Sequence, residues 1–87
     1  MEIKMFVLEN CPYCKKAKQD LEQLLQEERY QEITIKEIDE EKEEELAKMH
    51  DYYYVPSFYI QDKKIHEGAT DQEKIRMILE QGLEELA

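Results

Sequence analysis

Two cysteines, Cys11 and Cys14, are the residues of this chain best suited to chemistry. They are separated by two residues, so a bridge between them would close almost no loop and would stabilise the folded protein little. Two cysteines in 87 residues also cannot build the disulfide framework of a small secreted protein. A single Cys-x-x-Cys pair therefore indicates redox chemistry or metal binding.

A structural zinc site is the first alternative to weigh. Such a site needs four ligands, usually two cysteine pairs or one pair with two closely spaced histidines. The chain has no second cysteine pair, and its only histidines, His50 and His66, are far apart and distant from the cysteines in the sequence. We therefore expect no structural zinc site within the chain, and both histidines are expected at the surface or at an edge.

The elements around the cysteines predict different roles for them. Residues 2–8 are apolar on both faces, which predicts a central β-strand. From Pro12 to about Glu28 the apolar residues recur every three or four positions, which predicts an amphipathic helix with proline at its first position. Cys11 then lies at the helix N-terminus, where unpaired N–H groups and the helix dipole favour a thiolate, so it is the expected nucleophile. Cys14 lies one turn further in, on the apolar face, and is the expected resolving thiol.

Three lysines follow the cysteines. Lys15, Lys16 and Lys18 lie in a segment, residues 11–18, that has no acidic residue. Their charge would stabilise a thiolate at Cys11 and attract anionic thiols such as glutathione. Lysines are also common on any exposed helix face, so the sequence leaves both interpretations open.

The middle of the chain predicts a second strand and a second helix. Ile33 and Ile35 alternate with polar residues in a short strand, and Ile38 is out of phase at its end. Residues 39–45 contain six acidic residues and one lysine. They are interpreted as the solvated first turn of a short helix that Asp39 caps and that continues through Leu46, Met49 and His50; an acidic docking surface is the alternative.

The last third of the chain predicts a hairpin and a helix. Pro56 makes Val55 extended and ends any helix before it. Residues 57–60 and 64–67 form two strands around a turn at 61–63. Asp71 caps a final helix with apolar positions at Ile75, Ile78, Leu79, Leu83 and Leu86.

Composition narrows the choice of partners and location. The formal net charge is −10, so binding to nucleic acid or to an anionic membrane would work against the field of the whole protein. No apolar run approaches the roughly 20 residues that span a bilayer, and no signal peptide is recognisable. We expect a single domain over residues 1–87, monomeric and cytoplasmic.

The cysteine motif and the proline after it resemble a known family. The tetrad Cys11-Pro12-Tyr13-Cys14 between a strand and a helix, with Val55-Pro56 leading into a hairpin, resembles a glutaredoxin or glutaredoxin-like small redoxin of the thioredoxin-fold superfamily. The likeness covers essentially the whole chain. It implies a thioredoxin-like α/β fold, βαβαββα, in which three helices flank a four-stranded mixed sheet of order 2-1-3-4. The first and third helices would cover one face and the second helix the other.

The resemblance also implies a site. Pro56 would be cis and lie against the cysteines, and the backbone of Val55 would pair with the extended substrate. The residues expected to contact substrate are Pro12, Tyr13, Tyr54, Val55, Pro56, Gly68, Thr70 and Asp71.

Several positions depart from the glutaredoxin pattern. Leu8 stands where glutaredoxins have a basic residue, and Tyr54 stands where they have threonine. His66 and Glu67 stand where they have a glycine pair, whereas Gly68-Ala69 resembles the start of the last thioredoxin helix. These departures leave open whether glutathione or a thioredoxin-reductase-type donor reduces the protein.

The predicted function is that of a dithiol–disulfide oxidoreductase acting on protein or low-molecular-weight mixed disulfides. Cys11 would attack the substrate and Cys14 would resolve the intermediate. No metal or tightly bound cofactor is required, and glutathione is a possible co-substrate. The alternative is a glutaredoxin-like dimer that holds an iron–sulfur cluster through Cys11 of each chain.

Overall fold

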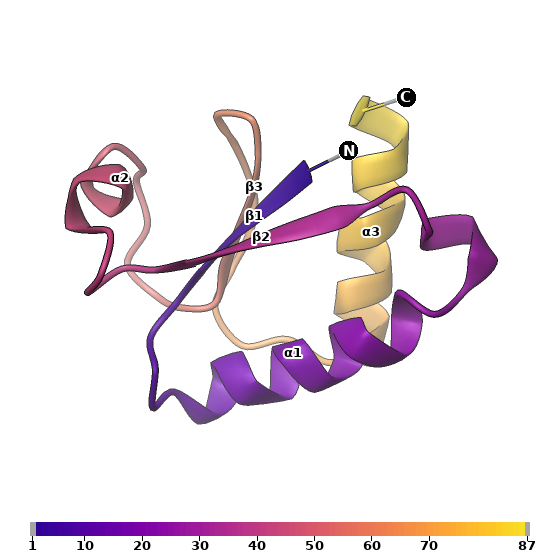
Figure 1. Ribbon diagram of the computed structural model, residues 1–87, viewed down its shortest axis with the longest axis horizontal. Helices are drawn as coiled ribbons and strands as arrows, with labels where there is room; N and C mark the ends of the chain where they lie inside the picture. Colours follow the sequence, from indigo (N-terminus) through magenta and orange to yellow (C-terminus); the bar gives the residue numbers. More distant parts are fainter. Residues whose placement is uncertain (1, 87) are drawn as a thin grey trace.

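The computed structural model describes residues 2–86, except for the side chain of Leu86, so that apolar position lies outside the described side chains. Four strands form one mixed sheet in the order β2-β1-β3-β4, as the resemblance implied (Figure 1). The elements in chain order are β1 (Glu2–Val7), α1 (Pro12–Leu24), a 3-10 helix η1 (Glu28–Tyr30), β2 (Thr34–Asp39), α2 (Glu44–Lys48), β3 (Ser57–Ile60), β4 (Lys63–Glu67) and α3 (Gln72–Leu86).

The strand pairing follows from the connections. β1 pairs with β2 in parallel, because the intervening α1 carries the chain back across the sheet. β1 and β4 each pair with β3 in antiparallel orientation, and β3 and β4 form the predicted hairpin. Gln61 adopts the left-handed conformation in its tight turn, with φ 54°, and β4 begins at Lys63, one residue earlier than predicted.

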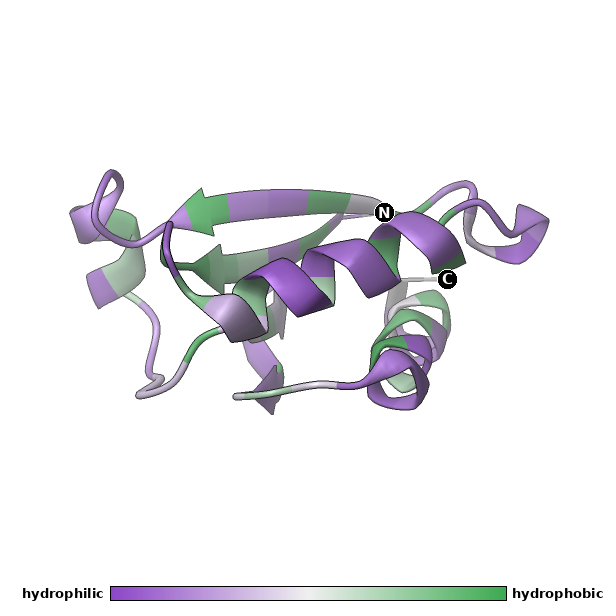
Figure 2. Ribbon diagram, turned by 90° about the horizontal axis from the view of Figure 1, so that it is seen from below, coloured by the Kyte–Doolittle hydropathy of each residue, from purple (hydrophilic) through white to green (hydrophobic). Residues whose placement is uncertain are grey.

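The sheet is buried on both faces. α1 and α3 cover one face, where β1 contributes Ile3, Met5 and Val7 to the larger core. α2 lies over the other face, where Phe6 packs with a smaller apolar cluster. Figure 1 shows α2 at the left end of the molecule, well separated from α3. In Figure 2 hydrophobic and hydrophilic stretches alternate along α1, as expected of a helix with one buried side.

The out-of-phase Ile38 marks a change of face within β2. Ile33 and Ile35 belong to the core under α1 and α3, whereas Ile38 is fully buried on the opposite face with Phe6 and Tyr59. Successive side chains of a strand point to opposite faces, so an odd spacing puts Ile38 under α2. Both faces of this parallel strand are therefore partly covered.

The predicted end of the first helix is wrong. α1 ends at Leu24 rather than near Glu28, and the chain continues into η1. The reason is tertiary: Tyr30 in η1 is fully buried, and its hydroxyl donates to Glu80 of α3 over 2.5 Å. An uninterrupted α1 would not present Tyr30 to α3 in this way.

Asp39 does not cap α2. It ends β2, and its side chain accepts a hydrogen bond from the N–H of Glu41 at 2.9 Å, so it stabilises a turn instead. α2 starts at Glu44 after the N-cap Glu43 and has only five residues. The helix also ends at Lys48, before Met49 and His50, which the prediction had included, and Met49 is 80% exposed.

The cap of α3 is as predicted. The Asp71 carboxylate accepts a hydrogen bond from the N–H of Lys74 at 2.8 Å, which satisfies one of the free donors of the first turn. Ile75, Ile78 and Leu79 are buried against the sheet. Within residues 2–86, no helix has the length and apolar character needed to cross a membrane.

Candidate functional site

Cys11 is the N-cap residue of α1, directly after the loop that follows β1. Its backbone is extended, with φ −86° and ψ 116°, and Pro12 occupies the first turn. The first turn has no acidic residue, and no side chain caps it. The partly exposed thiol of Cys11 therefore lies beside unpaired backbone N–H groups and the positive end of the helix dipole.

Cys14 lies one turn further along α1 and is only 1% exposed. The pKa of its thiol is raised to about 12; burial is the largest cause, and a hydrogen bond with Cys11 and the charge of Cys11 also contribute to the rise. A hydrogen bond with the backbone of Leu8 and the charge of Lys18 oppose the rise in this pKa. At neutral pH Cys14 is therefore a protonated thiol beside a partly exposed Cys11. Both cysteines are free in this structure.

The loop before β3 contains Val55 and Pro56 and is called the cis-proline loop below. It approaches Cys11. The Val55–Pro56 peptide bond is cis, as the resemblance implied. The Sγ of Cys11 lies 3.9 Å from the carbonyl oxygen of Val55, close enough for the thiol to donate a weak hydrogen bond. Residues 44 positions apart in the sequence thus meet at the N-terminus of α1.

Gly68 supports this loop from the end of β4. Its N–H donates to the carbonyl oxygen of Pro56 over 2.8 Å. Its φ is +95°, a conformation in which a residue with a Cβ would be strained, and a Cβ built here would lie 4.0 Å from that of Tyr54. Glycine at position 68 therefore allows the chain to turn directly after β4, beside the cis-proline loop.

The tyrosines divide into two groups. Tyr52 packs on Phe6, with ring centroids 5.0 Å apart, and donates a hydrogen bond to Glu40. Tyr13, Tyr53 and Tyr54 are exposed by 59%, 86% and 70% respectively. Tyr13 belongs to the cysteine tetrad, and Tyr53 and Tyr54 directly precede Val55, whose carbonyl oxygen lies 3.9 Å from the Sγ of Cys11.

Thr70 and Asp71 are positioned differently from the other predicted contact residues. The Asp71 carboxylate is engaged as the cap of α3. The hydroxyl oxygen of Thr70 is buried and has no hydrogen-bond partner among the described residues. The structure joins Cys11, Val55, Pro56 and Gly68 by direct contacts, but it gives no such contact between these two residues and the cysteines.

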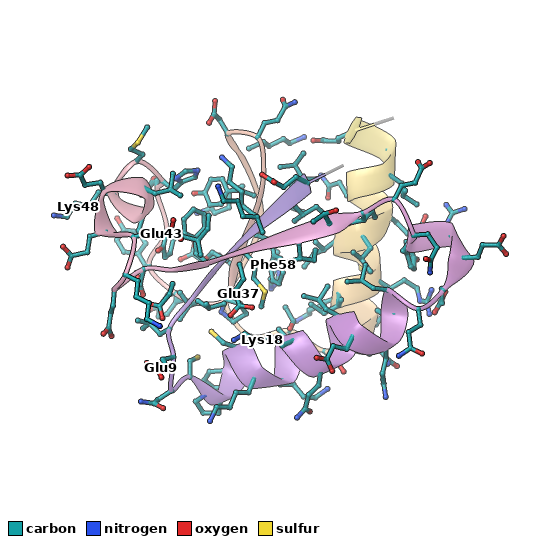
Figure 3. All side chains as sticks on the ribbon, in the orientation of Figure 1. Glu9, Lys18, Glu37, Glu43, Lys48 and Phe58 are labelled. Carbon is teal, nitrogen blue, oxygen red and sulfur yellow. The ribbon has the colours of Figure 1, made fainter. Side chains whose placement is uncertain are left out.

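Acidic partners offset much of the lysine charge after the cysteines. Lys16 forms an ion pair with Asp20 at 2.7 Å, and Lys18 forms one with Glu37 of β2 at 2.6 Å. Figure 3 shows Lys18 and Glu37 close together between α1 and β2. Glu37 raises the pKa of Lys18, so this ammonium stays charged near Cys14. The expected attraction of anionic thiols by all three lysines is correspondingly weaker.

One contributor to the site has no signal in the sequence. Glu67 at the end of β4 accepts hydrogen bonds from the backbone N–H groups of Tyr53 and Tyr54. Position 67 was notable only as a departure from the glycine pair of glutaredoxins. A glutamate at a strand end is ordinary, and only the fold shows that its carboxylate reaches the loop before Pro56.

Among the described residues, no three histidine, cysteine, aspartate or glutamate side chains are close enough together to hold a metal ion.

Comparison with known proteins decides the family. A family model described as a thioredoxin domain matches residues 1–80. The chain belongs to the thioredoxin-domain family. The fold is accordingly a thioredoxin-like α/β fold, with the four-stranded mixed sheet and three helices described above. A thioredoxin domain with two neighbouring cysteines indicates thiol redox chemistry in general terms.

Several solved structures share the fold of this thioredoxin-family chain. The germline-specific thioredoxin Deadhead from Drosophila melanogaster matches with a TM-score of 0.70 at 20% identity, over 92% of this chain and 78% of its own. A malarial protein matches with a TM-score of 0.71 at 14% identity, over 92% and 93%. An uncharacterized thioredoxin-like protein from Clostridium perfringens matches with a TM-score of 0.67 at 28% identity, over 92% and 68%. No curated protein matches the sequence.

Proposed function

We propose that this thioredoxin-family protein is a dithiol–disulfide oxidoreductase with Cys11 as nucleophile and Cys14 as resolving thiol. The observation that carries the proposal is the contrast between the two sulfurs. Cys11 is partly exposed at the N-terminus of α1, 3.9 Å from the cis-proline loop, whereas Cys14 is buried one turn away. One thiol is accessible to substrate and the other can be reached only from Cys11.

The reaction transfers two electrons in two exchanges. The Cys11 thiolate attacks one sulfur of the substrate disulfide, a mixed disulfide forms, and the other substrate sulfur leaves as a thiolate that takes up a proton. Cys14 then loses its proton and attacks the Sγ of Cys11. The second substrate thiol is released, and the protein is left with a Cys11–Cys14 disulfide. The substrate is reduced and the protein is oxidised.

The reductant that restores the Cys11–Cys14 dithiol is either glutathione or a reductase. The tetrad Cys11-Pro12-Tyr13-Cys14 supports a glutaredoxin-like activity, in which glutathione reduces the protein. Leu8 in place of a basic residue and the two ion pairs of Lys16 and Lys18 favour a reductase donor instead. Either donor would complete the same cycle at the cysteines.

Turnover assays with defined donors test this function. The reduced protein is mixed with a glutathione mixed disulfide coupled to glutathione reductase, and separately the oxidised protein is offered to a thioredoxin reductase. We expect turnover with at least one system, loss of turnover in Cys11→Ser, and accumulation of a Cys11 mixed disulfide in Cys14→Ser with a polypeptide substrate, detected by mass spectrometry. Failure of the wild-type protein with both donors, together with no exchange in a single turnover, would refute the proposal.

A further inference from the structure

The backbone before the cis-proline loop is held from β4 by one carboxylate. The Oε2 of Glu67 accepts hydrogen bonds from the N–H groups of Tyr53 at 2.5 Å and Tyr54 at 2.8 Å. The Oε1 of Glu67 accepts one from Lys64 at 2.7 Å. The side chain of Glu67 is only 17% exposed. Hydrogen bonds to an ionised group are stronger than those between neutral groups, so this carboxylate fixes two consecutive residues.

The carboxylate stays ionised under all ordinary conditions. Its ion pair with Lys64 and the two backbone N–H groups hold the pKa of Glu67 at about 2. The anchor therefore does not depend on pH in the neutral range.

Further contacts fix the residues on both sides of Val55. The hydroxyl of Ser57 donates to the carbonyl oxygen of Tyr54 at 2.5 Å, and the N–H of Gly68 donates to that of Pro56. The Val55 carbonyl is itself 3.9 Å from the Sγ of Cys11. A defined backbone thus leads from the two tyrosines to the nucleophile.

The side chains on this fixed backbone remain largely exposed. Tyr53 is 86% exposed and Tyr54 is 70% exposed, although large aromatic side chains are usually buried at least in part. Aromatic rings presented on an ordered backbone can bury much area in a complex with little loss of conformational freedom. A disulfide of two small thiols offers no extended chain that could lie along the two rings. A polypeptide disulfide has chain on either side of its sulfur and can use them.

We propose that Glu67 is a positioning residue for polypeptide substrates. Its carboxylate orders the backbone of Tyr53 and Tyr54, and the two exposed rings then form a docking edge for an extended polypeptide whose disulfide reacts at Cys11. This inference rests on the proposed function and specifies its substrate class: disulfides within polypeptides are preferred over disulfides of small thiols.

Single-turnover kinetics test this inference without any electron donor. The pre-reduced protein is mixed with insulin as the polypeptide disulfide and with bis(2-hydroxyethyl) disulfide as the small one, and the second-order rate constant of the exchange is measured for each over a range of substrate concentrations. In Glu67→Gln we expect the ratio of the insulin rate constant to the small-disulfide rate constant to fall about tenfold, mainly because insulin half-saturates the exchange rate at a higher concentration, since at least one charge-assisted hydrogen bond is lost. Tyr53→Ala should lower the same ratio, and its exposed side chain makes a folding defect improbable.

Two variants serve as matched controls. Lys64→Gln removes the ion pair but leaves both backbone hydrogen bonds to Glu67. Glu32→Gln removes the same charge from an exposed position. Both should keep the wild-type ratio within about twofold, a range that corresponds to less than about 0.5 kcal/mol.

The outcomes separate this inference from the proposed function. An unchanged ratio in Glu67→Gln and Tyr53→Ala would overturn the inference, as would an equal loss for both substrates in Glu67→Gln, since that loss would indicate a general structural role. A wild-type protein inactive on both disulfides would instead overturn the proposed function.

Discussion

Replacing Cys11 with alanine should lower the pKa of Cys14 without returning it to the ordinary value of 9.0. In the intact site the pKa of Cys14 is about 12; burial is the largest cause, and Cys11 contributes through a hydrogen bond and through its charge. Cys11→Ala removes the contributions of Cys11 but leaves Cys14 buried on the core-facing side of α1. We therefore expect a midpoint between 9.0 and about 12.

The size of the shift sets the chemistry of the second exchange. A rise from 9.0 to about 12 favours the thiol of Cys14 by about 4 kcal/mol, since each pKa unit corresponds to about 1.4 kcal/mol. At pH 7 about one Cys14 in 10⁵ is a thiolate, compared with about one in 100 for a thiol with the ordinary pKa of 9.0. Release of substrate by Cys14 should consequently accelerate about tenfold per pH unit between about pH 6 and pH 9.

The raised pKa of Cys14 also predicts how the free energy of unfolding changes at alkaline pH. A thiol with a raised pKa in the folded state keeps its proton after the unfolded chain has lost it. The unfolded state therefore binds fewer protons above about pH 9, and the free energy of unfolding falls as pH rises towards 12.

The assay is direct. The ¹³Cβ chemical shift of Cys14 is followed by NMR in Cys11→Ala from pH 6 to pH 11, because this signal reports the thiolate without interference from the tyrosines. A signal that does not move below pH 9 and moves above it is the expected result. A midpoint at or below 9.0 would refute the reasoning that burial keeps Cys14 protonated.

Three further variants test the surroundings of the site. Phe58→Ala should reduce the free energy of unfolding by about 3 to 5 kcal/mol in urea, because this ring is fully buried in the sheet core; a loss below about 1 kcal/mol would contradict that role. Lys18→Met should raise the pKa of Cys14 and slow the second exchange at pH 7 while leaving the first exchange unchanged, which stopped-flow kinetics can separate. Arg29 holds the pKa of Glu80 at about 2, so Glu80 stabilises the fold above pH 4.5 and less as pH falls towards 2; Glu80→Gln should therefore lose less stability over that range in acid unfolding.

Local patterns were sufficient to predict most of the fold. Alternation and two-sided apolar character located β1, and the proline before Ser57 with a turn at 61–63 located the β3–β4 hairpin. The cap of α3 by Asp71 was also predictable, because a capping side chain acts within four residues of itself. These features depend on neighbours in the sequence, which a single chain displays.

Features that depend on distant residues were missed or misassigned. Aspartate is a residue type that often caps helices, but Asp39 lies at the end of β2, where its side chain stabilises a turn. The early end of α1 follows from the burial of Tyr30 against α3, 50 residues away from its partner Glu80. In both places the contacts of the folded protein, and not the local helix propensity of the residues, decide where the helix begins or ends.

The same distinction explains which parts of the candidate site the sequence could reveal. Cys11 and Cys14 are identified by their spacing at a strand-to-helix junction, so their different exposure follows from local geometry. The role we propose for Glu67 depends on hydrogen bonds that span 13 and 14 positions, between the end of β4 and a loop without regular structure. No periodicity or motif encodes such a contact. If Glu67 orders the docking edge as we propose, substrate preference in this chain is set by a residue whose importance appears only when β4 is placed beside the cis-proline loop.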